Sequence, residues 1–240
     1  MIDPGRSFDR AAEEYDRGRP GWPEAVLDVV PVERAATVLD LAAGTGKLTE
    51  VLVRRYARVL AVEPLDAMRA ILERRVPAAE VHAGRAEAIP IDVAALDALF
   101  VAQAFHWFAT DQAVAEIARV LRPGGVLALL WQEPSGRAPS PLPDAYRRRL
   151  DELHESVPPP APDWRRVLAR GPFGDLTTAT VEHQQASDRE RVLAFAGSVS
   201  WIAHRPDEER RRVLEELGTL LPPGDYRFTM TAEVTWTRRR

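Results

Sequence analysis

From residue 36 onward, short apolar runs alternate with longer amphipathic segments, and this alternation restricts the fold more than any other feature of the chain. The apolar runs predict strands at 38–41, 59–62, 80–83, 98–102 and 126–131. The amphipathic segments predict helices at 47–56, 66–75 and 111–121. Strands that alternate with helices in this way form a mostly parallel sheet covered on both faces. The pattern therefore predicts a doubly wound α/β fold.

Further elements are expected on either side of this stretch. Two helices precede it, at 8–18 and 24–30, and the second is opened by Pro23, a residue favoured at the first position of a helix. After it, Ser187 with Glu190 three residues later forms a capping box, which predicts the start of another helix. The remaining expected elements are a helix at 144–156, closing strands at 177–184 and 226–237, and loops at 133–141 and 158–163.

All of these elements are expected to form one domain over residues 1–240, because the sheet begins near residue 38 and closes only with the C-terminal strands. With the two closing strands the sheet has seven strands. The expected divisions are a helical cap at 1–35, a core at 36–132, a lid or insertion at 133–176, and closing strands with C-terminal helices at 177–240.

The composition limits which chemistry the chain can perform. None of the 240 residues is cysteine, so disulfides, thiolate nucleophiles, zinc knuckles and iron–sulfur clusters are excluded, and no metal site is expected. A formal charge of −4 gives no general attraction for nucleic acid. No apolar run approaches the roughly 18 residues of a membrane span, and no signal peptide is recognisable. We therefore expect a cytoplasmic protein without nucleic-acid or membrane partners.

The segment from Val38 to Lys47 is an apolar strand that runs into Gly44-Thr45-Gly46 and then into a helix. Such a turn lets a ligand approach the backbone closely and points helix N-terminal amides at it. Glu63 follows the second strand, 17 residues after Gly46. An acid at that place can accept both hydroxyls of an adenosine ribose.

Three nucleotide ligands compete for this turn. A phosphate-binding Walker loop fails, because Leu41 and Leu48 stand where it needs glycine and serine or threonine. A dinucleotide fingerprint needs a small residue where Thr49 stands, so an NAD(P)-dependent oxidoreductase is the second interpretation. An adenosine ligand without phosphates remains. Asp40 favours it, because a carboxylate would repel pyrophosphate but suits the ammonium group of an amino-acid tail.

At these residues the chain resembles the class I S-adenosylmethionine-dependent methyltransferases, and among them the small-molecule branch called methyltransferase type 11. The blocks that agree in order and spacing are Phe8-Asp9 with Tyr15 and Arg19-Pro20, the loop from Asp40 to Gly46, Glu63, Gly84-Arg85-Ala86-Glu87, Gln103 to Phe108, and Leu121 to Gly125. The resemblance implies a Rossmann-like sheet with an antiparallel closing strand. It implies S-adenosylmethionine as the cofactor and S-adenosylhomocysteine as its product.

The resemblance also implies roles for individual residues. Gly44 and Gly46 pass under the methionine part, Asp40 helps to hold its ammonium group, and Glu63 binds the ribose hydroxyls. Gln103 lies beside the methionyl tail. The other cofactor-binding positions are Ala86 at the adenine edge, Tyr15 and Arg19 as a cap over the carboxylate, and Ala42, Thr45, Pro64, Met68 and Glu87 around them.

This sequence departs from the resembled pattern at two positions. Ala42 stands where many members have a first glycine, and we expect this substitution to be sterically mild. Arg85 stands where many have an aspartate that accepts the adenine amino group, so Glu87 is the expected replacement.

A sulfonium cofactor carries an activated methyl group, so the chain has chiefly to hold an acceptor in line with it. His106, which follows the fourth strand directly, is the candidate base if the acceptor must lose a proton. Trp22, Trp107 and Trp201 are the candidates for an acceptor pocket. The expected partner is a small-molecule acceptor, and the protein is expected to be a monomer or a homodimer. A non-catalytic S-adenosylmethionine-binding protein would have the same motifs.

Overall fold

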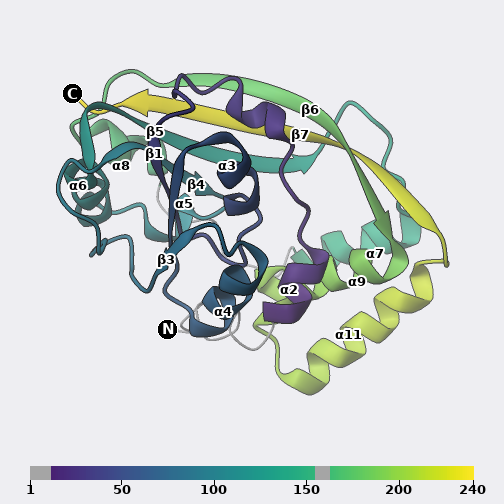
Figure 1. Ribbon diagram of the computed structural model, residues 1–240. Coiled ribbons are helices and arrows are strands. Elements are labelled where there is room, and N and C mark those ends of the chain that lie inside the picture. Colours follow the sequence, from purple (N-terminus) through teal and green to yellow (C-terminus); the bar gives the residue numbers. More distant parts are fainter. Residues whose placement is uncertain (1–11, 155–162) are drawn as a thin grey trace. The chain divides into compact units, whose positions relative to one another are not determined.

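Figure 1 shows the protein as a computed structural model, which describes residues 12–154 and 163–240. Phe8 and Asp9, most of the predicted loop at 158–163 and the ends of two predicted helices lie outside these residues. One sheet contains seven strands in the order β3-β2-β1-β4-β5-β7-β6. The strands are β1 (Thr37–Leu41), β2 (Arg58–Val62), β3 (Glu80–His82), β4 (Leu96–Ala102), β5 (Leu121–Pro134), β6 (Thr177–Asp188) and β7 (Asp225–Arg238).

Six of the seven strands run parallel and β7 is the antiparallel closing strand. The β5–β7 pairing is visible at both ends, since the Ser135 amide donates to the Thr229 carbonyl at 2.7 Å and the Arg239 amide donates to the Gly125 carbonyl at 2.8 Å. This topology confirms the predicted Rossmann-like, doubly wound sheet.

The helices of the described residues include those of the predicted alternation, at 49–55, 66–75 and 111–120, and also helices that were not predicted, at 105–108, 164–169 and 200–203. They are α2 (Ala12–Gly18), η1 (Glu24–Leu27, a 3-10 helix), α3 (Thr49–Arg55), α4 (Asp66–Arg75), α5 (Phe105–Phe108), α6 (Asp111–Val120), α7 (Asp144–His154), α8 (Trp164–Ala169), α9 (Arg189–Ser198), α10 (Ser200–Ala203) and α11 (Asp207–Leu220). The predicted helix at 66–75 has the observed bounds, because its apolar residues Met68, Ile71 and Leu72 are buried together on one face.

Several predicted element bounds are wrong. The helix expected at 24–30 is the 3-10 helix η1, and the elements expected to begin at residues 47 and 98 begin at Thr49 and Leu96. Two further starts are wrong for reasons that their contacts show. The helix expected to begin at Ser187 begins after Asp188, whose carboxylate accepts the Arg191 amide at 2.8 Å and caps α9 in place of the serine. Strand β5 begins at Leu121 rather than at residue 126, because Leu121 pairs with Leu96 before a bulge that contains Gly124 at φ 75°. The Gly-Gly segment is therefore an irregularity inside the strand and not a turn before it.

The chain forms two compact units. We call Gly21–Glu133, Pro160–Val181 and Thr231–Arg240 the sheet unit, and Met1–Pro20, Pro134–Pro159 and Glu182–Met230 the helical unit. In the sheet unit, alternate strand residues pack against different helices. Leu39 and Leu41 pack in a cluster with α6 and α8, while Val38 packs in a cluster with η1 and α3. Helices thus cover both faces of the sheet.

The helical unit has its own apolar core, formed by α7, α9, α10 and α11 with Tyr226 of β7. Helices α2 and α9 approach each other closely, since a Cβ on Gly18 would lie 2.2 Å from the Phe195 amide nitrogen. Glycine at residue 18 is therefore needed for this helix contact.

Candidate functional site

The turn between β1 and α3 contains residues in the left-handed region of backbone space. Gly44 has a φ of 57° and Gly46 a φ of 85°, which glycine adopts without strain. A Cβ on Gly46 would also lie 2.4 Å from Leu72 Cδ1 of α4. Both the backbone conformation and the packing of α4 therefore require glycine at residue 46.

Ala42 lies in the same left-handed region, with a φ of 57°. This conformation costs a residue with a Cβ roughly 1–2 kcal/mol. The expectation that alanine is a mild replacement for glycine here is therefore wrong for the backbone. The turn holds Ala42 in place through its neighbour, because the Ala43 amide donates to the Val62 carbonyl at 3.2 Å and the Ala43 carbonyl accepts the Gly46 amide at 3.0 Å.

Asp40 is a buried carboxyl group just before this turn, with 1% of its surface exposed. Its Oδ2 accepts a hydrogen bond of 2.6 Å from the Thr49 hydroxyl, whereas its Oδ1 and the Thr45 hydroxyl have no partner among the described residues. Burial, the largest cause, raises the pKa of Asp40 to about 7, and the nearby charge of Glu63 adds to the rise. A cation placed against Oδ1 would lower this pKa and satisfy the oxygen.

Glu63 is the second buried carboxyl group, 4% exposed, at the carboxyl end of β2. Its Oε2 accepts the Gly44 amide at 2.9 Å and its Oε1 accepts the Leu65 amide at 3.0 Å. Each carboxylate oxygen can accept more than one hydrogen bond. Glu63 therefore joins the Gly-rich turn to the start of α4 and can still accept hydroxyl groups of a ligand.

The other predicted cofactor residues of the sheet unit lie on the segments that follow β2 and β3. Pro64 follows Glu63 directly, and Met68 lies in the first turn of α4 with 3% of its surface exposed. Ala86 and Glu87 belong to the loop after β3. Ala86 is buried, whereas the Glu87 carboxylate lies 3.8 Å from Arg85 Nε.

Gln103 and His106 lie at the carboxyl end of β4. Gln103 has a φ of 57°, and its side-chain amide donates to the Gln132 carbonyl at 2.7 Å. His106 is half-buried, and burial lowers its pKa below the ordinary value, which favours the neutral imidazole. Trp107 beside it is 50% exposed, with the two rings 5.0 Å apart.

An aromatic cluster extends from these residues to β5 and α8. Trp131 stacks on Trp164 with ring centroids 4.9 Å apart, and Phe105 meets Trp164 edge-on at 5.9 Å. Trp131 was missed by the sequence reasoning, although its place at the carboxyl end of a parallel strand is where such sheets bind ligands. Trp22, predicted to line an acceptor pocket, packs in the core cluster with Val26 and is 8% exposed.

Tyr15, Arg19 and Trp201 belong to the helical unit. The Arg19 guanidinium lies over the Tyr15 and Phe195 rings at 4.9 and 5.1 Å, and it donates to the Ser198 hydroxyl and carbonyl at 3.1 Å each. Trp201 meets the His154 ring edge-on at 5.7 Å. The predicted roles of all three residues toward ligands stay predictions.

No group of three or more His, Asp or Glu side chains that could hold a metal ion occurs within residues 12–154 and 163–240. Over the same ranges, no helix is long and apolar enough to cross a membrane.

The site thus combines a tight glycine turn, a carboxyl group that would accept a cation, and a carboxylate that would accept hydroxyls. This set of acceptors suits a nucleoside with a cationic tail and no phosphate groups.

Comparisons with known proteins agree with this chemistry. The sequence model of the family described as "Methyltransferase domain" matches residues 39–129. An uncharacterized methyltransferase of Mycobacterium tuberculosis is 36% identical over 219 residues, which cover 91% of this chain and 87% of the relative.

Solved structures share the fold. A structure from Anaeromyxobacter dehalogenans, described as a type II methyltransferase, matches with a TM-score of 0.62 at 27% identity, over 92% of this chain and 97% of that one. Geranyl diphosphate C-methyltransferase from Streptomyces coelicolor, crystallised with S-adenosylhomocysteine, matches with a TM-score of 0.51 at 14% identity, over 90% and 77% of the two chains. At that identity the second match shows the fold alone.

Proposed function

Because this chain belongs to the class I S-adenosylmethionine-dependent methyltransferases, in the type 11 branch, we propose that it moves a methyl group to a small-molecule acceptor by direct in-line transfer. When bound, S-adenosylmethionine supplies a methyl group that is already activated on a sulfonium sulfur. The chain has to orient the acceptor and keep water away. No nucleophilic side chain is needed for this reaction.

The pair of buried carboxyl groups at neighbouring strand ends carries the proposal. Asp40 Oδ1 is a buried acceptor without a partner among the described residues, and an ammonium group would satisfy it. Glu63 stands on the adjacent strand with both oxygens already aligned by backbone amides. We assign the ammonium group of the methionine part to Asp40 and the ribose hydroxyls to Glu63.

The remaining cofactor contacts follow the order of the strands. Gly44 and Gly46 would pass under the methionine part, because a Cβ would intrude there. Gln103 would lie beside the methionyl tail. Further residues in this assignment are Ala42, Thr45, Pro64, Met68, Ala86 and Glu87, with Tyr15 and Arg19 as the predicted cap.

On the acceptor side, His106 and Trp107 support a role in substrate binding. A neutral, half-buried imidazole can take a proton from an acceptor hydroxyl or activated carbon, whereas a carboxylate acceptor needs no base. The exposed indole of Trp107, next to the His106 ring, favours an apolar or planar acceptor. Trp22 and Trp201 stay predictions for this pocket.

Calorimetric titration with S-adenosylmethionine, S-adenosylhomocysteine and NADH tests the cofactor assignment. We expect both adenosyl ligands to bind and NADH not to bind. Glu63→Gln should weaken adenosyl binding by about tenfold or more, because an amide nitrogen replaces one acceptor oxygen. The matched control is Glu80→Gln, which changes an exposed acid of β3 paired with Arg58 at 2.8 Å. Binding of NADH alone would overturn the proposal in favour of an oxidoreductase.

A panel of small-molecule acceptors, with release of S-adenosylhomocysteine as the readout, tests catalysis. His106→Asn should slow transfer to hydroxyl acceptors and leave transfer to carboxylate acceptors nearly unchanged. Tight cofactor binding without turnover on any acceptor would instead favour a non-catalytic binding protein.

A further inference from the structure

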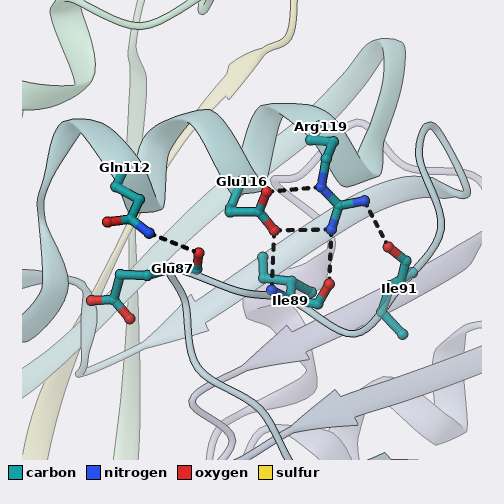
Figure 2. Close-up of polar contacts among 6 residues, drawn as sticks. All are labelled: Glu87, Ile89, Ile91, Gln112, Glu116 and Arg119. Atoms are coloured by element: carbon teal, nitrogen blue, oxygen red, sulfur yellow. Dashed lines mark hydrogen bonds and ion pairs between the residues drawn. The ribbon is translucent and has the colours of Figure 1, made fainter.

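Three side chains of α6 hold the loop that follows β3 (Figure 2). Gln112, Glu116 and Arg119 are four and three residues apart, so they share one face of the helix. All three point toward the loop and contact its backbone at residues 87–91. The loop therefore owes its conformation to a helix that is distant in sequence.

In Figure 2, side chains of α6 form hydrogen bonds with both amide donors and carbonyl acceptors of the loop backbone. The Glu116 carboxylate accepts the Ile89 amide at 3.1 Å, and Arg119 donates to the Ile89 carbonyl at 2.8 Å and to the Ile91 carbonyl at 2.9 Å. Glu116 and Arg119 are themselves paired at 2.8 and 2.9 Å. Gln112 donates to the Glu87 carbonyl at 3.3 Å. Three side chains of α6 thus satisfy backbone donors and acceptors of this loop.

The same loop packs directly beside the assigned ribose site. The Glu63 amide donates to the His82 carbonyl at 3.1 Å, immediately before the loop begins. A Cβ on Gly84 would lie 3.1 Å from Val62 Cγ1. Ala86 and Ile89 are buried in the cluster that contains Val62. A displacement of the loop would therefore change the packing next to Glu63.

The ion pair itself adds little to stability, since the Arg119 and Glu116 side chains are 36% and 22% exposed. What it does fix is geometry, because Arg119 presents a planar fork of donors to two carbonyl groups at once. In the proposed function, the methionine part lies toward β1 and β4 and the ribose lies at β2. The base attached to that ribose then falls on the side of β3, where this loop lies.

We propose that Glu116 and Arg119 are positioning residues for base recognition: by holding the backbone of Ile89 and Ile91, they fix the preceding residues 86–88 in the conformation that selects adenine over other bases. This inference rests on the proposed function, because it needs an adenosyl ligand whose ribose is bound by Glu63. Neither side chain touches the ligand in this scheme. They act through the loop backbone that they hold.

The test compares S-adenosylhomocysteine with its inosine analogue, in which a carbonyl replaces the 6-amino group of adenine. Calorimetry on the full chain gives both dissociation constants, and their ratio measures base selectivity. Arg119→Met and Glu116→Gln should lower this ratio by about tenfold, because the loop loses charged hydrogen bonds. Arg119→Lys keeps the charge but not the fork, so it should also lower the ratio.

Arg170→Met is the matched control, since it removes an arginine that pairs with Asp111 of the same helix at 2.7 Å and donates to the Arg166 carbonyl rather than to the loop. It should leave the ratio unchanged. Thermal unfolding of each variant shows whether it is folded. If Arg119→Met does not fold, Arg119→Lys takes its place in the test.

The outcomes separate this inference from the proposed function. A wild-type protein that binds neither adenosyl ligand contradicts the proposed function. A wild-type protein that binds both bases equally overturns the inference alone. Variants that lose affinity for both ligands in the same proportion also overturn it, because the pair would then have only a structural role.

Discussion

Replacing Asp40 by asparagine should remove a pH dependence of stability that the wild-type protein carries. Burial raises the pKa of Asp40 from its ordinary 3.8 to about 7. Between these two values the folded state keeps a proton that the unfolded state has released, so rising pH favours unfolding. The stability that depends on this group is therefore fully present below about pH 4, falls as the pH rises to about 7, and is constant above.

The interval between 3.8 and about 7 corresponds to roughly 4 kcal/mol, at about 1.4 kcal/mol for each tenfold change in proton affinity. This is a large part of the roughly 5–15 kcal/mol that stabilises a typical domain. An asparagine at residue 40 keeps an acceptor for the Thr49 hydroxyl and never has to bury a charge. The Asp40→Asn variant should thus be about as stable as wild type near pH 4 and more stable, by up to roughly 4 kcal/mol, near pH 8.

Urea unfolding of both proteins, followed by circular dichroism from about pH 4 to about pH 8, measures this difference. Asp97→Asn is the control, because the pKa of Asp97 is shifted in the opposite direction to that of Asp40. Burial acts to raise the pKa of Asp97, but hydrogen bonds from the Thr37 amide and Arg122 outweigh it and lower the pKa. The Asp97→Asn variant should lose more stability at neutral pH than in acid. If the Asp40→Asn and wild-type stabilities stay parallel over this range, the raised pKa of Asp40 is refuted.

Three further predictions concern glycine and alanine positions. Gly46→Ala should lower the free energy of unfolding by about 2–4 kcal/mol in urea titrations, because its Cβ would overlap Leu72 at a φ of 85°. Ala42→Gly should range from neutral to about 1 kcal/mol more stable, since relief of left-handed strain exceeds the added freedom of the unfolded chain. Gly18→Ala should speed amide hydrogen exchange in α9, because its Cβ would lie 2.2 Å from the Phe195 nitrogen.

Strong periodicity made the sheet and its main helices predictable from sequence. The apolar residues of α4 recur at helical spacing, and both of its ends agree with the prediction, whereas the N-cap of α9 is Asp188, one residue after the predicted Ser187. Ser187 and Asp188 can both cap a helix, and only the continuation of β6 through Asp188 decides between them. Likewise, the start of β5 depends on pairing of Leu121 with Leu96, a contact between strands that local sequence does not record.

The sequence could propose cofactor residues such as Asp40, Glu63 and Gln103 because they stand at strand ends, where a parallel sheet binds ligands, and their roles stay predictions. The support for the loop after β3 was not predictable. In the sequence, Glu116 and Arg119 have the spacing of an ordinary ion pair on a helix. The sequence does not show which loop lies opposite these two side chains. The role of Trp131 was not predicted either. Its stacking partner Trp164 belongs to α8, which lies outside the predicted alternation of strands and helices.

Glu63 shows why the two strongest sequence motifs cannot be tested separately. Its Oε2 accepts the Gly44 amide, so the acid that would bind the ribose also holds the turn that would lie under the methionine part. Truncation to alanine would release the Gly44 amide, and the resulting loss of binding would have two causes. Glu63→Gln keeps one acceptor oxygen. If the Gly44 amide keeps its hydrogen bond in this variant, the loss of ligand affinity measures the contacts between residue 63 and the ribose hydroxyls. Exchange protection of the Gly44 amide in that variant distinguishes the two causes, because an amide that remains protected has kept its acceptor.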